Sequence, residues 1–195
     1  DRELVSIDTM AETMELYVNV PYISSTVDTE IYIYFDNGAA TEVNDAAVWR
    51  SEYTGVWHFE DDISMTTEID DSSQSDNDGF ARAGLDGDNI VSGVVGNAYQ
   101  FNNSEYIALE NFYSGSGSLG QVSVSAWINT TVNSGGQNTN WAILDFDRSD
   151  FFDVYAHGDG RLSFSTNSPS GGIDDFYDSS GNVVNDGSWH HVAAV

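Results

Sequence analysis

An acidic, turn-rich loop at residues 70–79 is the segment best suited to hold a metal ion. Calcium takes roughly six to eight oxygen ligands at about 2.4 Å, and Asp and Asn side chains supply such oxygens. The loop is not an EF-hand, because no Glu stands at the twelfth position. The alternative is that these side chains only close turns by bonding to their own backbone. The candidate ligands are Asp70, Asp71, Asp76, Asn77 and Asp78.

Neither the histidines nor the carboxylates form a pattern that indicates catalysis. His190 and His191 are consecutive in an expected strand, so their side chains point to opposite faces and cannot bind one zinc ion together. Glycoside hydrolysis needs two carboxylates about 5–9 Å apart. Asp145 and Asp147 would share one strand face, but no Glu follows them. The Gly-x-Ser-x-Gly motif of a nucleophilic serine is also absent. We therefore expect a protein that is not an enzyme.

Aromatic residues beside Gly-, Ser- and Asp-rich segments are the candidates for ligand contact. A flat ring can cover the face of a sugar, and loops on a rigid scaffold are where binding residues concentrate. Packing of the same rings in the core is the alternative. Trp57, Trp127 and Trp189 are expected to fill the core, because they fall within expected strands. The candidate ligand-binding residues are Phe112, Tyr113, Phe151, Phe176 and Tyr177.

The charge of the chain excludes several classes of partner. Its 195 residues include 32 acidic residues against 5 Arg and no Lys, for a formal net charge of −27. Nucleic acids and anionic membranes both require clustered cationic side chains, so neither is expected as a partner. No apolar run approaches the roughly 18 residues of a membrane helix, so membrane insertion is not expected. Self-repulsion of this size favours a saline environment or bound cations.

Short alternating segments separated by turn residues predict an all-β chain. Residues 16–20 and 30–35 are expected to pair as two antiparallel strands. Residues 121–130 alternate most clearly, with aliphatic side chains on one face and Trp127 on the other. Strands at this spacing predict a two-sheet antiparallel sandwich. Further strands are expected at 56–59, 97–101, 106–109, 141–146, 151–156, 161–165 and 189–195.

The last expected strand has consequences for partners. Residues 189–195 are followed by no turn, so we expect the sandwich to be truncated at this end and completed by another segment or chain. An open strand edge is a template for pairing. Self-association through open strand edges is therefore expected as one mode of contact.

From residue 56 onward the chain resembles the laminin-G-like, concanavalin-A-like superfamily. The matching landmarks follow one another in the order that the family shows. They are VWHFED (56–61), DSS to NDG (71–79), GNAYQF (96–101), VSVSAWI (122–128), GRLSF (160–164) and GSWHHVA (187–193). The resemblance implies an antiparallel jelly-roll β-sandwich that binds a glycan or a cell-surface protein. It also implies a structural Ca²⁺ near a loop comparable to residues 70–79, and catalysis is uncommon in the family.

Residues 1–50 are similar to the C-terminal half of a bacterial and archaeal domain of unknown function that often precedes such sandwiches. LYVNVP (16–21), IYIYFDN (31–37) and AVW (47–49) carry this second resemblance. We thus expect a partial β-rich domain at 1–50 and a sandwich at 51–195.

Three functions remain open from the sequence. The first is an extracellular or cell-surface binding module that is non-catalytic and stabilised by calcium. The second is a structural subunit of a surface filament or pilus that is completed by strand exchange with a neighbour. The third is a periplasmic sensor within a proton-channel-linked transport complex.

Overall fold

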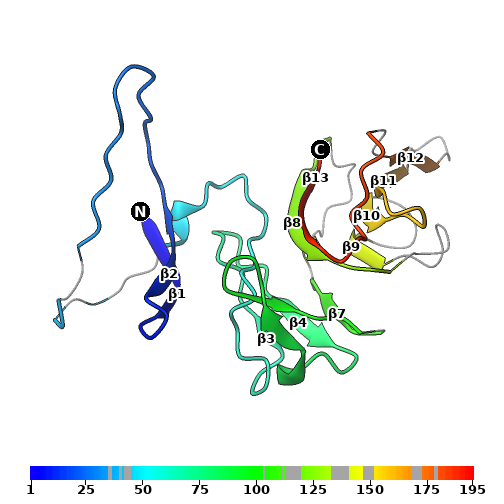
Figure 1. The fold of residues 1–195 in the computed structure, drawn as a ribbon, viewed down its shortest axis with the longest axis horizontal. Coiled ribbons are helices and arrows are strands. Elements are labelled where there is room, and N and C mark those ends of the chain that lie inside the picture. The colour runs from blue at the N-terminus through cyan, green and yellow to red at the C-terminus, as the bar shows by residue number, and fades with distance from the viewer. Residues whose placement is uncertain are drawn as a thin grey trace. The chain divides into compact units, whose positions relative to one another are not determined.

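The computed structural model groups the chain into two compact units, residues 1–115 and 116–195, and each is described by itself. Within the described residues every regular element is a β-strand or a short 3-10 helix, which confirms the predicted all-β class (Figure 1). In that part of the chain no helix is long and apolar enough to cross a membrane. The described residues are 1–34, 37–39, 41, 45–102, 104–110, 112, 120–132, 141–146, 152–167, 173–177 and 180–195.

The first unit opens with an antiparallel hairpin of β1 (Arg2–Asp8) and β2 (Thr13–Val18). Asp8 holds the turn between them, because its carboxylate accepts hydrogen bonds from the backbone N–H groups of Met10 at 2.8 Å and Ala11 at 2.9 Å. These bonds, the one from Ala11 foremost, lower the pKa of Asp8.

The pairing predicted for residues 16–20 is wrong. Their partner strand is β1, with Leu4 opposite Leu16, whereas residues 31–34 lie outside any strand. Local alternation indicates that a segment can form a strand, but it does not say which segment pairs with it. The apolar side chains of residues 31–34 are left exposed as a result.

The rest of the first unit consists of two small antiparallel sheets and two short helices. One sheet has the order β3-β4-β7, and the other is the hairpin β5-β6. Residues 56–59, which were predicted to form a strand, lie outside any strand. The elements are η1 (Ala46–Val48), β3 (Glu68–Ile69), β4 (Gly79–Arg82), η2 (Gly87–Asn89), β5 (Ile90–Ser92), β6 (Asn97–Tyr99) and β7 (Tyr106–Ala108).

The core of this unit lies beneath β3, β4 and β6. Ile69 is completely buried, and Trp57 and Phe59 pack against the buried cluster although they belong to no strand. Trp57 therefore reaches the core as predicted. The buried cluster consists of Ile63, Ile69, Ala81, Leu85 and Tyr99.

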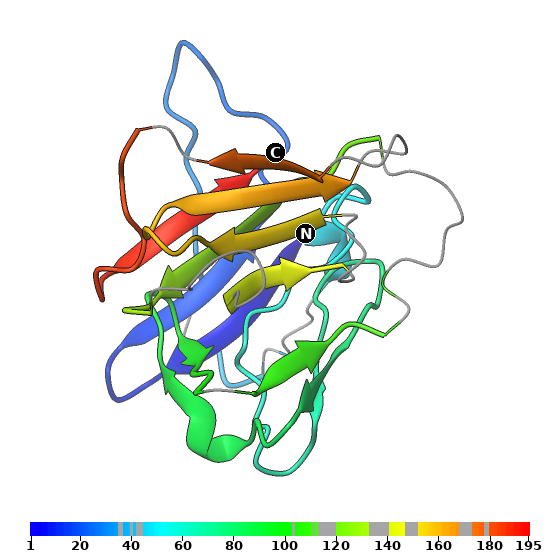
Figure 2. The ribbon, with the colours of Figure 1, turned by 90° about the vertical axis from the view of Figure 1, so that its right-hand side faces the viewer.

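The second unit is built from two antiparallel sheets (Figure 2). One has four strands in the order β12-β11-β10-β9, and the other pairs β13 with β8. Side chains from both sheets meet in one apolar cluster, which includes Ala126 and Val192 from one sheet and Ala156 and Leu162 from the other. The strands are β8 (Val124–Asn129), β9 (Trp141–Asp145), β10 (Phe152–Ala156), β11 (Leu162–Asn167), β12 (Ile173–Tyr177) and β13 (Trp189–Ala194).

Most strands predicted in this unit are confirmed, and β8 alternates as expected. Val124, Ala126 and Ile128 are half-buried on one face. On the other face Trp127 is 48% exposed, so the expectation that it fills the core is wrong. Its ring instead meets the edge of His191, with 5.2 Å between centroids. β12 falls at residues where no strand was predicted.

Candidate functional site

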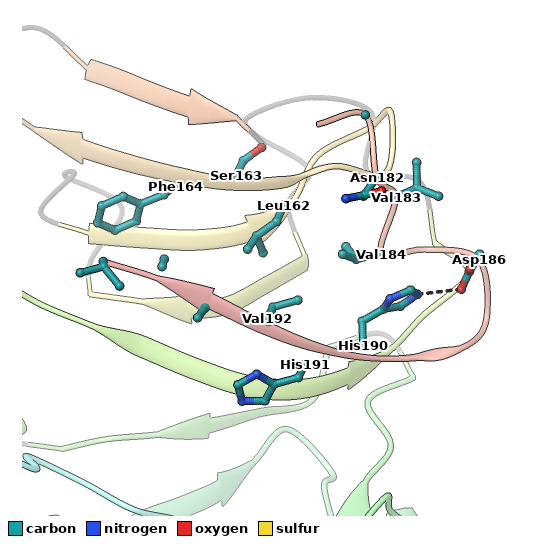
Figure 3. Close-up of a pocket in the computed structure, with 14 residues that line it drawn as sticks. Leu162, Ser163, Phe164, Asn182, Val183, Val184, Asp186, His190, His191 and Val192 are labelled. Carbon is teal, nitrogen blue, oxygen red and sulfur yellow. Dashed lines mark hydrogen bonds and ion pairs between the residues drawn. The ribbon is translucent and has the colours of Figure 1, made fainter. Parts of the chain in front are cut away.

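A groove of about 1040 Å³ opens in the second unit between β11 and β13 (Figure 3). Leu162 and Phe164 of β11 line it on one side, and β13 lines it from His190 onward. The segment at 181–186, which contributes Val184 and Asp186, closes one end. The groove therefore combines apolar side chains with the backbone of a strand.

The unequal widths of the two sheets explain why the groove exists. Four strands make up one sheet, whereas among the described residues β13 pairs with β8 alone. A two-stranded sheet cannot cover the inner face of a four-stranded one, so part of β11 lies open beside β13. In the described part of the chain the second edge of β13 thus has no partner strand.

His190 supplies the polar chemistry of the groove. Its Nε2 lies 2.9 Å from Oδ1 of Asp186, and the backbone N–H of Ser188 donates to the same oxygen at 2.8 Å. These two hydrogen bonds, the one with His190 foremost, lower the pKa of Asp186. The prediction that consecutive histidines face opposite ways is confirmed, because the side chains of His190 and His191 lie on opposite sides of β13 (Figure 3). The ring of His191 meets Trp127.

The described lining of the groove offers a single side-chain carboxylate, that of Asp186. Glycoside hydrolysis uses two carboxylates about 5–9 Å apart. Asp145 lies on β9, opposite Asp153 of β10, and not among the groove's described lining. Asp147 lies outside the described residues. The described lining can contact a ligand through apolar side chains and through the hydrogen-bonding groups of His190 and Asp186.

Among the described residues, none of the aromatic residues predicted to contact a ligand is part of the groove's lining. The ring of Phe112 packs against Trp57 in the first unit, with 5.8 Å between centroids. Phe176 and Tyr177 lie on β12, where the backbone pairs them with Phe164 and Ser163. Tyr113 and Phe151 lie outside the described residues. Ligand contact by these residues stays a prediction.

The acidic loop at 70–79 is organised around the carboxylate of Asp71, which is 8% exposed. Its Oδ1 accepts the backbone N–H of Val56 at 2.7 Å and that of Ser73 at 2.8 Å. Its Oδ2 accepts the Ser73 hydroxyl and the backbone N–H of Asn77, both at 2.8 Å. Four donors from three residues therefore converge on one side chain, as in the turn-forming alternative of the sequence analysis.

The other predicted calcium ligands have individual roles in the same loop. Asp78 accepts the backbone N–H of Asp71 at 2.9 Å, and the Asn77 amide donates to the carbonyl of Thr54 at 2.6 Å. Asp76 adopts a left-handed φ of 55°, which Asp tolerates better than most residues.

The fit of this loop to calcium depends on which carboxylates remain available. Both oxygens of Asp71 accept hydrogen bonds from the chain itself, and one oxygen of Asp78 accepts the backbone N–H of Asp71. Among the described residues, no group of three or more His, Asp or Glu side chains is arranged to hold a metal ion. Calcium binding at this loop stays a prediction.

The carboxyl group of Asp61 lies close enough to Asp70 and Asp78 for their charges to change its pKa. Burial raises its pKa, and the nearby charges of Asp70 and Asp78 raise it further. Its Oδ2 accepts the backbone N–H of Asp70 at 3.3 Å, so the two residues are held side by side.

We expect the stability of the chain to fall as pH rises through the raised pKa of Asp61. The folded state holds the Asp61 proton more tightly than the unfolded state, so this contribution is complete below the ordinary Asp range and lost above the raised pKa. Asp61→Asn should flatten that part of the profile of unfolding free energy against pH. Asp62→Asn is the matched control. Hydrogen bonds from Ser64 lower the pKa of Asp62, so this substitution should change the pH profile of stability in the opposite direction. Equal profiles for the two variants would contradict this account.

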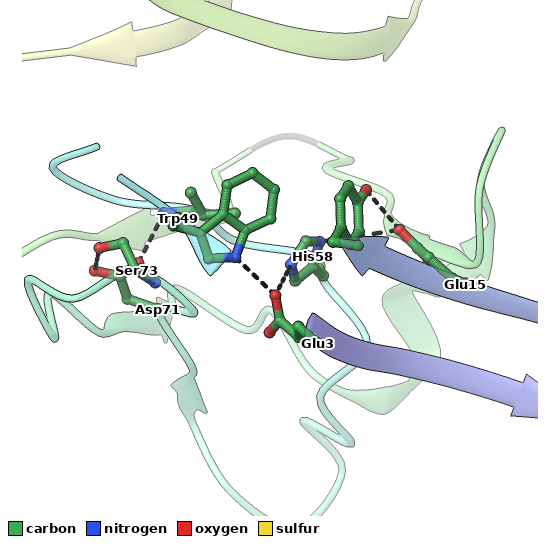
Figure 4. A network of polar contacts seen from close by, with 8 residues as sticks. Glu3, Glu15, Trp49, His58, Asp71 and Ser73 are labelled. Atoms are coloured by element: carbon green, nitrogen blue, oxygen red, sulfur yellow. Dashed lines mark hydrogen bonds and ion pairs between the residues drawn. The ribbon is translucent and has the colours of Figure 1, made fainter. Parts of the chain in front are cut away.

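A polar network that sequence reasoning missed lies between β1, β2 and residues 49–58 (Figure 4). Glu3 is 8% exposed, and its Oε2 accepts the Trp49 indole N–H at 2.7 Å and lies 3.3 Å from Nε2 of His58. Tyr17 donates to Glu15 at 2.7 Å and packs against Trp49 and His58, each with 4.9 Å between centroids.

This network fixes the hairpin to the rest of its unit. Burial and the hydrogen bond to Glu15 raise the pKa of Tyr17, so the hydroxyl stays a donor at physiological pH. The residues are far apart in sequence, 46 positions in the case of Glu3 and Trp49, so no local pattern could indicate the cluster.

The fold and groove define the class of protein: an all-β antiparallel sandwich with an open inter-sheet groove. Residues 101–195 match a laminin-G-type family model, described as the concanavalin A-like lectin/glucanases superfamily. No curated protein and no solved structure matches the chain. The family match begins at residue 101, so the landmarks at 56–100 lie outside it. The resemblance of residues 1–50 and the domain boundary after residue 50 stay predictions.

Proposed function

We propose that the chain is a non-catalytic binding module of an extracellular or cell-surface protein, and that its ligand is a glycan or a protein held in the groove between β11 and β13. The groove is the observation that carries this proposal. Support comes also from the family that residues 101–195 match, whose laminin-G-like members are typically non-catalytic binding modules.

The lining favours a ligand that combines apolar groups with hydrogen-bonding groups. Leu162, Phe164 and Val192 offer apolar contact, and His190 with Asp186 offers a donor and an acceptor. The net charge of −27 disfavours acidic ligands, because like charges repel at ranges of about 8 Å at physiological salt.

A panel of glycans and extended peptides tests the proposal. We expect at least one class to bind without being consumed, and His190→Ala to weaken that binding about fivefold, since loss of a hydrogen bond costs about 1 kcal/mol. His157→Ala is the matched control, because His157 is likewise hydrogen-bonded to an aspartate, Asp159, at 2.8 Å, away from the groove's described lining. Turnover of a bound glycan would contradict the non-catalytic assignment. Equal binding by both variants would contradict the groove as the site.

Calcium belongs to the same proposal as a stabiliser of the loop at 70–79. The proximity of Asp61, Asp70 and Asp78 supports it, because a divalent cation would offset their mutual repulsion. We expect millimolar Ca²⁺ to raise the melting temperature and EDTA to reverse the rise, with Mg²⁺ as the control for general screening. A melting temperature that responds equally to Ca²⁺ and Mg²⁺, or to neither, would contradict this part.

A second candidate function, a structural subunit completed by strand exchange, is favoured by one specific observation. Within the described residues the second edge of β13 has no partner strand, and the apolar groove runs along it. An added strand would satisfy that edge and cover Leu162 and Phe164 at the same time.

A further inference from the structure

The chain carries an exposed segment whose residue types favour a β-strand, although the segment lies outside any strand. Residues Ile31, Tyr32, Ile33 and Tyr34 are 57%, 70%, 53% and 93% exposed, respectively. They lie outside any strand. β-branched and aromatic residues are those that favour strands most, because they pack well on a pleated surface. Four consecutive exposed residues of this kind form a ready donor for strand pairing.

The groove beside β13 is complementary to this segment. So is the second edge of β13, which has no partner strand among the described residues. A strand that pairs with β13 places alternate side chains on one face, where they would enter the groove between β11 and β13. Val184 and Val192 are buried there, at 8% and 5% exposure, so the floor of the groove is apolar. The one side-chain carboxylate in its described lining, Asp186, is already bonded to His190. Residues 31–34 contain no charged side chain to oppose entry.

We propose that residues 31–34 of one copy add as a strand to β13 of a second copy of this chain. This inference rests on the second candidate function, strand exchange, and names its donor. Each copy carries one donor segment and one acceptor edge at different places, so the contact is heterologous and joins more than two copies into rings or open chains.

Salt concentration should control this association. Two copies that each carry a formal charge of −27 repel one another at low ionic strength. At about 1 M salt the Debye length falls to about 3 Å, and the short-range pairing of uncharged segments is then unopposed. We therefore expect the mean mass in sedimentation velocity to rise with salt and with protein concentration.

Cysteine cross-linking tests the contact directly, because the natural chain contains no Cys. One preparation of the full chain, the acceptor, carries Ala194→Cys on β13. The others carry, one at a time, Ile31→Cys, Tyr32→Cys, Ile33→Cys or Tyr34→Cys. Ile23→Cys is the control, because Ile23 is also exposed, at 74%, but lies outside the donor segment. Pairs are mixed at about 1 M salt and oxidised, and mixed dimers are measured by mass.

The expected result is an alternating pattern. Either positions 31 and 33 or positions 32 and 34 should form mixed dimers with the Ala194→Cys acceptor, and the other two should not, because only one face of a paired strand points to the acceptor's inner side. Ile33→Pro, which removes a backbone N–H from a segment that is unpaired in the monomer, should abolish the salt-driven rise in mass. Ile23→Pro should leave it intact.

Two outcomes would overturn the inference. One is a set of mixed dimers without alternation, equal to that of the Ile23→Cys control; the other is no mixed dimer at all. Failure here is distinguishable from failure of the binding-module function. If a glycan or peptide from the panel protects β13 from hydrogen exchange while no alternating cross-link forms, the groove is a binding site for another ligand.

Discussion

Replacing Asp71 by alanine should lower the free energy of unfolding by an amount on the order of 3 kcal/mol. The variant leaves the backbone N–H groups of Val56, Ser73 and Asn77 and the Ser73 hydroxyl without their acceptor. These groups lie around a side chain that is 8% exposed, so water replaces the lost bonds poorly. Chemical denaturation, with hydrogen exchange to locate the loss within residues 1–115, measures the effect.

Asp70→Ala is the matched control at the adjacent position. Asp70 is exposed, and its charge is one of those that raise the pKa of Asp61, so its removal relieves repulsion. We expect a change within about 0.5 kcal/mol, toward greater stability. Asp71→Asn should fall between the two, because the amide keeps one acceptor oxygen and places a donor where Asn77 N–H needs an acceptor. Equal losses for Asp70→Ala and Asp71→Ala would contradict the hydrogen-bonding role of Asp71.

Gly96→Ala is expected to have an effect of similar size, about 3 kcal/mol, for a different reason. Gly96 has a φ of 57°, in the left-handed region, at the turn between β5 and β6. A Cβ there would clash with Oε1 of Glu60. Glu60 would have to move, and its hydrogen bonds to the backbone N–H and side-chain amide of Asn97 would break. Thermal unfolding measures the loss.

Two comparisons separate the backbone cost from the clash. Gly84 has a φ of 95° and nothing within 4 Å of the position of a Cβ, so Gly84→Ala should cost only about 1 kcal/mol. In a Glu60→Ala background the severe clash is gone and only Glu15 Oε2, at 3.1 Å, stays close to the added Cβ. The added cost of Gly96→Ala should then fall toward that of Gly84→Ala. An undiminished cost in that background would show that Glu60 is not the obstacle.

β8 and β13 show most clearly what can be predicted from the sequence. The alternation at 121–130 correctly predicts which side chains are half-buried, and the opposite orientations of His190 and His191 follow from the same two-residue period. The period is a property of each strand alone, so neighbouring residues suffice to predict it. The same reasoning fails for β2, because the choice between β1 and residues 30–35 as partner depends on contacts outside both segments.

The all-β class was determined by the sequence itself, since alternation and turn residues lie within a few positions of one another. For the 70–79 loop the sequence left a calcium site and a turn-forming role as alternatives. Tertiary structure alone decided that Asp71 binds Val56, that Glu3 meets Trp49 and His58, and that β13 borders an open groove. The physical reason is that each of these features joins segments at least 15 residues apart. Such contacts form where packing brings the segments together, and no local pattern of residue types records that geometry.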